Sequence, residues 1–267
     1  MNILLTNDDG IYADGIAAMY QALLRAGHQA HVVAPSTERS AVGHAITVSD
    51  PLKVFQVEVD ARISGTAVVG TPADCVKLAA NALLKMRPDL VISGINRGAN
   101  TGNHIIYSGT VSAATEAAMF GLPALAVSLD ILSTRSKKHD FTFAAELAVT
   151  VGEEMMRRGN LPAGTLLNLN VPECDASEIK GLRIAKQARF SSLDVYEERI
   201  DPFERLYYWP KLEHVEVTDA PEIDVDYRLL KEKYAVLTPI QYDLTNYRML
   251  ETLRDWNIEK IFHVPSA

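Results

Sequence analysis

Two adjacent aspartates near the start of the chain are the residues best suited to carry chemistry. Asp8 and Asp9 stand in Asn7-Asp8-Asp9-Gly10, directly after an apolar run at residues 3–6. Two carboxylates this close repel each other, and one tends to stay protonated unless a cation lies between them. A set of oxygen ligands without histidine or cysteine suits Mg²⁺ or Mn²⁺ better than Zn²⁺. We therefore expect Asp8 and Asp9 to hold one divalent cation and to form the catalytic centre.

The same four residues also have a purely structural interpretation. Neighbouring side chains of a strand point to opposite faces, so both aspartates can face one ion only where the chain has left the strand. Gly10 permits such a turn. However, Asn-Asp-Asp-Gly is also ordinary turn chemistry before a helix, with Asp9 or Asp14 as a cap. Taken alone, these residues leave both interpretations open.

Two further polar loops follow predicted strands and favour a functional site. Residues 35–44 and 93–102 are rich in amide, hydroxyl and glycine groups. Because ligands of open α/β sheets bind at the carboxyl ends of the strands, we expect these loops to meet the aspartates at one edge. The candidate substrate-binding residues here are Asn7, Gly43, His44 and Asn100, and His104 is a further histidine that can contact substrate.

A third polar segment stands at the start of a predicted helix. Tyr107-Ser108-Gly109-Thr110 precedes a helical pattern at residues 111–120. Hydroxyl groups, free N–H groups and the positive end of the helix dipole can together bind phosphate oxygens. We expect Ser108, Gly109 and Thr110 to bind phosphate. Thr71, by contrast, forms a capping-box pattern with Asp74 and is expected to cap a structural helix.

Short apolar runs and helical patterns alternate through the first half of the chain. Strands are predicted at residues 3–6, 30–34, 90–93 and 124–128, and helices at 15–26, 72–85, 111–120 and 141–158. Such alternation implies parallel strands with right-handed crossovers and helices on both faces. We expect an α/β fold with a doubly wound, mostly parallel sheet in a Rossmann-like three-layer arrangement. A hairpin at residues 53–59 and 62–69 is predicted as an insertion after the second strand.

The chain changes character after the fourth predicted helix. One more strand is predicted at residues 166–171, followed by short strand-like runs at 182–186 and 234–238 and the aromatic segment Tyr207-Tyr208-Trp209-Pro210. We expect an α/β catalytic domain over residues 1–172 and a smaller, irregular, β-rich C-terminal extension over residues 173–267. The extension is expected to act as a lid or an oligomer contact and to return the chain to the core.

Composition restricts the partners and the compartment. Hydrophobic residues make up 48% and charged residues 22% of the 267 residues, as in ordinary globular proteins. No apolar stretch is long enough to span a membrane and no basic segment precedes the first strand, so we expect neither a membrane partner nor a secretory signal. The net charge of −8 argues against a nucleic-acid polymer as partner. Cys75 and Cys174 match no metal or redox spacing, which is consistent with a cytoplasmic protein.

Motifs of several other enzyme classes are absent from the sequence. There is no G-x-G-x-x-G after the first strand and no G-x-x-x-x-G-K-[ST], so neither a dinucleotide fold nor a P-loop is indicated. No G-x-S-x-G elbow supports a serine hydrolase, and no H-E-x-x-H pair supports a zinc protease.

Five motifs in the same order closely resemble the SurE (survival protein E) family. They are Asn7-Asp8-Asp9-Gly10, Glu38-Arg39-Ser40-Ala41-Val42-Gly43-His44, Gly70-Thr71-Pro72-Ala73-Asp74, Ser93-Gly94-Ile95-Asn96-Arg97-Gly98 and Tyr107-Ser108-Gly109-Thr110. Thr238-Pro239-Ile240 followed by Asp243-Leu244-Thr245 also resembles the C-terminal signature of that family.

The resemblance implies a 5′/3′-nucleotidase, a phosphatase that uses a divalent metal, acts on nucleoside monophosphates and in some members trims short polyphosphate. It implies Asp8, Asp9, Ser40 and Asn96 as the metal ligands. It also implies a homodimer or homotetramer formed by exchange of C-terminal elements.

We therefore expect a metal-dependent phosphohydrolase that acts on nucleoside 5′- and 3′-monophosphates. Three alternatives remain open. A phosphatase with an aspartyl-phosphate intermediate would use an aspartate as nucleophile, although the usual signature has one residue between two aspartates. A non-catalytic nucleotide sensor would bind nucleotide without releasing phosphate. A sugar-nucleotide transferase would not hydrolyse monophosphates.

Overall fold

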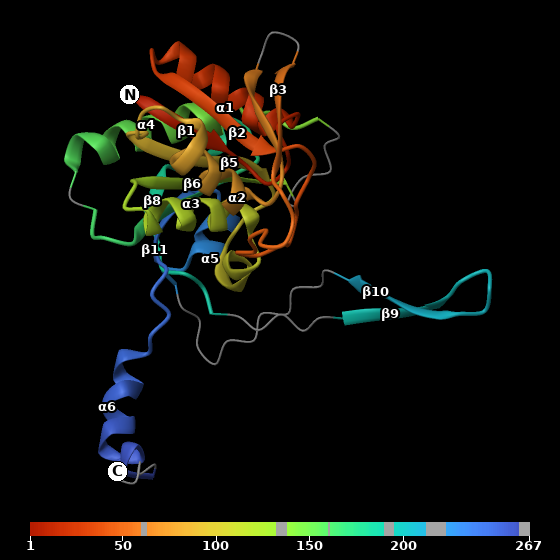
Figure 1. Cartoon of the computed structure of the whole chain (residues 1–267), viewed down its shortest axis with the longest axis vertical. Coiled ribbons are helices and arrows are strands. Elements are labelled where there is room, and N and C mark those ends of the chain that lie inside the picture. The colour runs from red at the N-terminus through yellow and green to blue at the C-terminus, as the bar shows by residue number, and fades with distance from the viewer. Residues whose placement is uncertain (60–62, 132–137, 160, 190–194, 212–222, 262–267) are drawn as a thin grey trace.

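One large sheet forms the centre of the molecule. The computed structural model describes residues 1–59, 63–131, 138–159, 161–189, 195–211 and 223–261 (Figure 1). Within these residues, nine strands form a sheet in the order β3-β4-β2-β1-β5-β6-β7-β11-β8. Pairing is antiparallel between β3 and β4 and between β7 and β11, and parallel elsewhere. The strands are β1 (Asn2–Thr6), β2 (Gln29–Pro35), β3 (Lys53–Val59), β4 (Ile63–Val69), β5 (Leu90–Arg97), β6 (Ala124–Asp130), β7 (Thr165–Pro172), β8 (Leu182–Ile184) and β11 (Ala235–Gln241).

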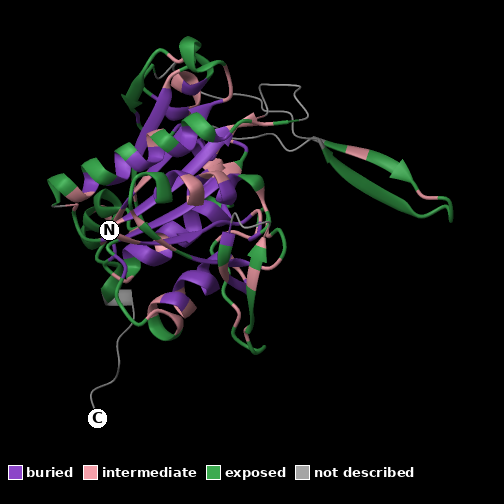
Figure 2. Ribbon diagram, turned by 90° about the horizontal axis from the view of Figure 1, so that it is seen from above, coloured by how far each residue is buried: buried purple, intermediate pink, exposed green. Residues whose placement is uncertain are grey.

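Helices cover both faces of this sheet. Helices α1 (Asp14–Arg25) and α4 (Thr142–Arg158) pack on one face, and α2 (Pro72–Leu78) and α3 (Gly109–Met119) pack on the other. Strand β1 is buried on both faces. Ile3 and Leu5 pack in the core on the side of α1 and α4, and Leu4 packs in the core on the side of α2 and α3. Figure 2 shows the buried strands between the helices. The doubly wound, mostly parallel α/β prediction is confirmed.

The structure adds detail to two predicted elements. The helix predicted at residues 72–85 is α-helical only to Leu78 and continues as one π-helical turn, η1 (Ala79–Leu83), before Leu84 becomes extended. The predicted hairpin is present as the antiparallel pair β3 and β4, between β2 and α2, and the pairing of β4 with β2 joins it to the main sheet. Residue 62 of that prediction lies outside the described residues.

The order of the strands creates a crevice between β1 and β5. The chain passes from β1 through α1 to β2 in one direction, and from β5 through α3 to β6 in the other. Loops at the carboxyl ends of strands diverge at such a point, where open α/β sheets bind their ligands. Asp8 and Asp9 follow β1, and Asn96 lies at the end of β5, so the fold brings both segments to this crevice.

The C-terminal part contributes to the sheet and also projects from it. Strand β11 pairs with β7 and with β8, and α5 (Asp226–Lys231) packs on β11. The hairpin of β9 (Val195–Ile200) and β10 (Leu206–Lys211) extends away from the body, as does α6 (Tyr247–Asp255) (Figure 1). The short helices η2 (Gly102–Ile106), η4 (Ala176–Glu178) and η5 (Ile258–Ile261) complete the described structure. The boundary at residue 172 stays a prediction.

The two cysteines are free, with Cys75 buried in the core and Cys174 half-buried. In the described part of the chain, no helix has both the length and the apolar character that a membrane crossing requires.

A buried carboxylate joins the C-terminal part to the loop after β5. Asp226 is fully buried, and its oxygens accept hydrogen bonds from the backbone N–H groups of Gly102 (2.9 Å), Ala188 (2.9 Å) and Tyr227 (2.7 Å). Burial raises the pKa of Asp226, although these N–H donors oppose the rise. Gln187 adds a second link, because its side-chain amide donates to the Gly102 carbonyl at 2.9 Å.

Removing this acceptor should destabilise the protein. Asp226→Ala leaves three backbone donors without their partner, and a buried unpaired donor costs about 1–3 kcal/mol, partly recovered by water. We expect the free energy of unfolding to fall by about 3 kcal/mol. Urea unfolding measures the change, with Asp224→Ala, an exposed aspartate two residues away, as the matched control. Equal effects of the two substitutions would contradict the structural role of Asp226.

Candidate functional site

Asp8 and Asp9 lie where β1 ends and are bound by three loops. The Asp8 carboxylate accepts a hydrogen bond from the Thr110 hydroxyl, and the Asp8 carbonyl accepts one from the backbone N–H of Arg39 at 2.7 Å. The Asp9 carboxylate accepts a hydrogen bond from the backbone N–H of Arg97 at 3.0 Å. Gly10 turns the chain with a φ of +97°. The expected convergence of the loops after β1, β2 and β5 is therefore present, together with the start of α3.

The N-terminus of α3 approaches Asp8 closely. A Cβ atom on Gly109 would lie 2.8 Å from the Cβ of Asp8 and 3.0 Å from its Oδ2, so no larger residue fits at this contact without a shift. Ser108 caps the helix, and its Oγ accepts a hydrogen bond from the Val111 N–H at 3.1 Å. The segment predicted to bind phosphate is thus in direct contact with one of the two aspartates.

The electrostatics of the aspartate pair are unfavourable without a cation. Only 4% of Asp8 is exposed. Burial raises the pKa of Asp8 to about 6, with a smaller contribution from the charge of Asp9, while the hydrogen bond from Thr110 opposes the rise. Burial also raises the pKa of Asp9, and the nearby Glu38 adds to the effect. Both carboxylates would be relieved by a positive charge between them.

The remaining donors near the pair supply neutral oxygen atoms. Among the described residues, no group of three or more His, Cys, Asp and Glu side chains could hold a metal, so a cation here must also use amide or hydroxyl ligands. The Asn96 amide nitrogen donates to the Gly98 carbonyl at 2.7 Å, which leaves its oxygen as the ligating end. The exposed Ser40 hydroxyl donates to Glu38 at 2.6 Å and keeps acceptor lone pairs.

One orphaned atom also fits a bound cation. The buried Oδ1 of Asn7 has no hydrogen-bond partner among the described residues, whereas its amide nitrogen donates to the Gly10 carbonyl at 2.8 Å. A buried carbonyl-type oxygen without a donor is costly unless something positive approaches it. Paired carboxylates and neutral oxygens are the donor set that a hard divalent cation prefers. The residues present therefore fit the predicted Mg²⁺ or Mn²⁺, and the ligand assignment stays a prediction.

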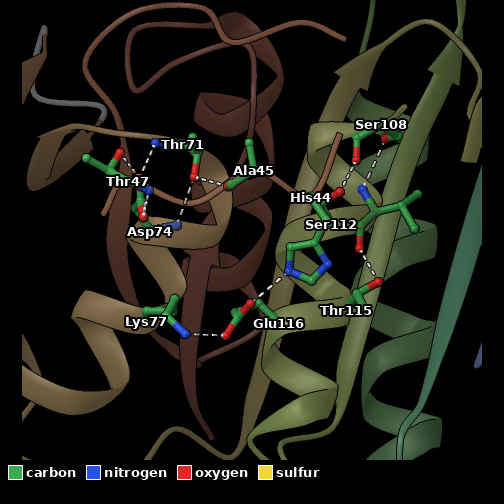
Figure 3. Close-up of polar contacts among 11 residues, drawn as sticks. His44, Ala45, Thr47, Thr71, Asp74, Lys77, Ser108, Ser112, Thr115 and Glu116 are labelled. Atoms are coloured by element: carbon green, nitrogen blue, oxygen red, sulfur yellow. Dashed lines mark hydrogen bonds and ion pairs between the residues drawn. The ribbon is translucent and has the colours of Figure 1, made fainter. Parts of the chain in front are cut away.

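Polar contacts hold the loop after β2 against helices α2 and α3 (Figure 3). His44 contacts Glu116 at 2.8 Å, and Lys77 contacts the other oxygen of Glu116 at 3.0 Å. Burial acts to raise the pKa of Glu116, but its bonds with His44 and Lys77 outweigh this and lower it. His44 is therefore tied to the helices, and the prediction that it contacts substrate stays a prediction.

The next residues of the same loop are anchored on the capping box of α2. Thr47 donates to Asp74 through its backbone N–H at 2.9 Å and through its hydroxyl at 2.6 Å. Thr71 and Asp74 form the predicted capping box, and the Thr71 hydroxyl donates to the Ala45 carbonyl at 2.8 Å. Gly43 donates to the Tyr107 carbonyl at 3.0 Å, next to Ser108. The loop is therefore held on the C-terminal side of Ser40 by the starts of α2 and α3.

Asn100 lies in a network of buried amides. Its backbone N–H donates to Asn170 at 2.7 Å, its side-chain nitrogen donates to Ser128 at 2.9 Å, and its carbonyl accepts from Asn168 at 2.8 Å. These contacts fix the path of the chain from β5 towards Ser108. They do not test the prediction that Asn100 contacts substrate.

A cavity beside Asp9 was not expected from the sequence. It has a volume of about 630 Å³ and is bounded by the start of α1, the loop after β2 and the segment before α4, with Tyr12, Glu38 and His139 in its walls. His139 contacts Glu173 at 2.6 Å, and both side chains are largely buried. In the sequence, Tyr12 just before the helix predicted at residues 15–26 was a signal that could have pointed to this site. The contact between His139 and Glu173 joins residues 34 positions apart and leaves no local pattern in the sequence.

Comparisons with known proteins show which family this chain resembles. The family model described as Survival protein SurE matches residues 3–193. The chain is 46% identical to a protein named 5′-nucleotidase SurE from Syntrophobacter fumaroxidans, over 97% of this chain and 100% of the relative. It is 47% identical to one of the same name from Nitratidesulfovibrio vulgaris, over 95% of this chain and 91% of the relative. A solved structure of SurE protein from Aquifex aeolicus superposes with a TM-score of 0.80 at 34% identity, and covers 96% of this chain and 100% of that one.

The raised pKa of Asp8 predicts how the stability of the metal-free protein depends on pH. Because the folded state binds the Asp8 proton more tightly than the unfolded state does, the free energy of unfolding falls as pH rises from about 4 to about 6. A rise of the pKa from 3.8 to about 6 corresponds to roughly 3 kcal/mol. Asp8→Asn should remove most of this loss and make the metal-free protein more stable than wild type at pH 7.

Urea unfolding in the presence of a chelator, from pH 4 to pH 8, measures this effect. The control is Asp50→Asn, which changes an exposed aspartate and should leave the pH profile unchanged. If Asp8→Asn were less stable than wild type at pH 7, the buried charge of Asp8 would not be the source of the cost.

Proposed function

This chain belongs to the SurE family, and on that premise we propose that it is a nucleotidase that releases phosphate from nucleoside 5′-monophosphates with the help of one divalent cation. The observation that carries the proposal is the contact between Asp8 and the N-terminus of α3. It brings a carboxylate pair suited to a cation against a helix start suited to phosphate. The names of the two similar proteins, both 5′-nucleotidases, supply the substrate class.

The proposed roles follow from the positions of the side chains. Asp8, Asp9, Ser40 and Asn96 would hold the cation, which we propose to be Mg²⁺ or Mn²⁺. A cation bound there would supply Lewis-acid chemistry, polarising a phosphoryl oxygen and lowering the pKa of a water molecule. Thr110 orients Asp8 through its hydroxyl.

The start of α3 would bind the phosphate. The Ser108 oxygen caps the helix and its hydroxyl proton stays available to a phosphate oxygen. The backbone N–H of Gly109 and the helix dipole would stabilise the charge that develops on the phosphoryl oxygens. The Thr110 N–H and hydroxyl are both directed at the Asp8 carboxylate, so Thr110 would act on the phosphate through Asp8. The groups of Ser108 and Gly109 would contact the phosphate and would not contact the alcohol that leaves. We therefore extend the proposal to nucleoside 3′-monophosphates and short polyphosphate.

We also propose that the protein forms a homodimer or homotetramer through its C-terminal part. The β9–β10 hairpin projects from the body (Figure 1) and exposes more than half of the side chains of Tyr196 (58%), Tyr208 (55%) and Trp209 (56%). Aromatic side chains concentrated on a projecting hairpin are typical of a surface that becomes covered by a partner.

Removal of metal should abolish activity, and Asp8 should be required for its return. Protein treated with a chelator should release no phosphate from AMP, and Mg²⁺ or Mn²⁺ should restore release. Asp8→Asn should lower kcat/KM for AMP by about 100-fold or more at saturating metal, whereas Asp50→Asn should not change it. Phosphate release is measured for each metal and each variant.

The outcomes separate the alternatives. Metal-dependent binding of AMP without phosphate release would support a nucleotide sensor. Covalent labelling of Asp8 or Asp9 during turnover would support an aspartyl-phosphate mechanism. Near-normal turnover of Asp8→Asn would remove Asp8 from the metal site. The expected gain in stability of the same variant without metal shows that a loss of activity is not a loss of the fold.

Charge on the hairpin should break the oligomer. The double variant Tyr208→Asp, Trp209→Asp places two carboxylates on the proposed contact surface, where their desolvation is costly. Its mass measured by light scattering should fall to that of a single chain. Met86→Asp, which changes an exposed side chain of the α/β body, is the control and should keep the wild-type mass. Wild-type protein that is already monomeric would contradict this proposal.

A further inference from the structure

The cavity beside Asp9 is larger than the metal and phosphate site requires. Its volume of about 630 Å³ lies in the range of about 300–1,000 Å³ that small-ligand sites occupy. Asp9, one of the four proposed metal ligands, lies in its wall beside Arg97, so the cavity borders the candidate metal centre. It also adjoins the crevice between β1 and β5, where this class of sheet binds ligands. A substrate whose phosphate lies at the aspartates therefore has room for the rest of the molecule here.

The charges in the wall favour a neutral group in most of this space. Three carboxylates (Asp9, Asp14 and Glu38) line the cavity, together with the basic side chains of Arg97 and Lys138. An extended polyanion would meet repulsion from such a wall unless cations accompanied it. Carboxylates are instead good acceptors for hydroxyl groups such as those of a ribose.

Aromatic side chains supply the second kind of contact. Tyr12 and Phe141 line the cavity, and 57% of Tyr12 is exposed, whereas Phe141 is buried in the wall. An exposed aromatic residue beside a cavity offers a flat surface on which a nucleobase can stack. Such stacking contributes about 1–3 kcal/mol per base and tolerates different bases.

We propose that this cavity binds the nucleoside portion of the substrate, with the base against Tyr12, so that Tyr12 sets the preference for nucleotides over other phosphate esters. The inference rests on the proposed function for the position of the phosphate. It adds a binding site for the leaving group, and it assigns to Tyr12 a role in binding and none in the chemical step.

The test compares two substrates that share the phosphate and the ribose. We would measure kcat/KM for AMP and for ribose 5-phosphate with the full-length protein and saturating Mg²⁺ or Mn²⁺. Tyr12→Ala should lower kcat/KM for AMP by about 5–100-fold and leave that for ribose 5-phosphate within about twofold. Tyr12→Phe keeps the ring and should retain AMP activity. Tyr242→Ala is the matched control, because Tyr242 is also exposed but follows β11 at the opposite edge of the sheet.

Direct binding of adenosine supplies a readout that needs no catalysis. Titration calorimetry should detect adenosine binding to wild type and to Tyr12→Phe, and its loss in Tyr12→Ala. The inference is overturned if Tyr12→Ala affects both phosphate esters equally, if it leaves AMP unchanged, or if wild type does not bind adenosine. Adenosine binding that depends on Tyr12, in a protein that releases no phosphate, would keep the nucleoside site and reject the nucleotidase. Hydrolysis of AMP by a protein that does not bind adenosine would keep the nucleotidase and reject the nucleoside site.

Discussion

The constraint on which the site depends is the position of the buried Asp8 beside the half-buried Asp9 at the end of one strand. A charge in this position is unfavourable, and the raised pKa values of Asp8 and Asp9 express that cost. The protein does not avoid the cost by exposing the pair. It gives the two carboxylates the backbone N–H of Arg97 and the hydroxyl of Thr110 as donors. These donors reduce the cost without removing it, so a divalent cation bound between the carboxylates would stabilise their ionised forms.

The rest of the fold keeps these donors in place. Thr110 can reach Asp8 only because α3 begins beside it, and the start of α3 depends on the path of the chain from Asn100 to Ser108. That path is held from the C-terminal side, where Asp226 accepts the Gly102 N–H, and from β7, where Asn168 and Asn170 donate to the Asn100 carbonyl. The C-terminal part is therefore coupled to the proposed phosphate site through buried polar contacts. A substitution in the C-terminal part can therefore shift the start of α3, where the proposed phosphate site lies.

The sequence predicted those features that follow from local pattern. The apolar run before Asp8 and the helical pattern after Thr110 placed both at the same edge of a parallel sheet, and the Thr71–Asp74 capping box was visible as a motif. Contacts between distant residues have no local pattern. His44 and Glu116 are 72 residues apart, and Gly102 and Asp226 are 124 apart. For the same reason the cavity was missed, because its walls come from segments around Tyr12, Glu38 and His139 that become neighbours only in the folded chain.

The environment of Asp8 also bears on how an aspartate here could act. A nucleophilic carboxylate must be ionised and must present an oxygen to phosphorus. Asp8 is almost fully buried, its pKa is raised towards 6, and one of its oxygens is occupied by Thr110, while its other oxygen lies near Gly109. The contacts with Thr110 and the start of α3 restrict how Asp8 could direct an oxygen at phosphorus. The same contacts suit a ligand, because a bound cation would stabilise the ionised form and the hydrogen bond from Thr110 fixes the direction of the carboxylate. The geometry therefore favours aspartates that hold the catalytic ion over aspartates that attack phosphorus.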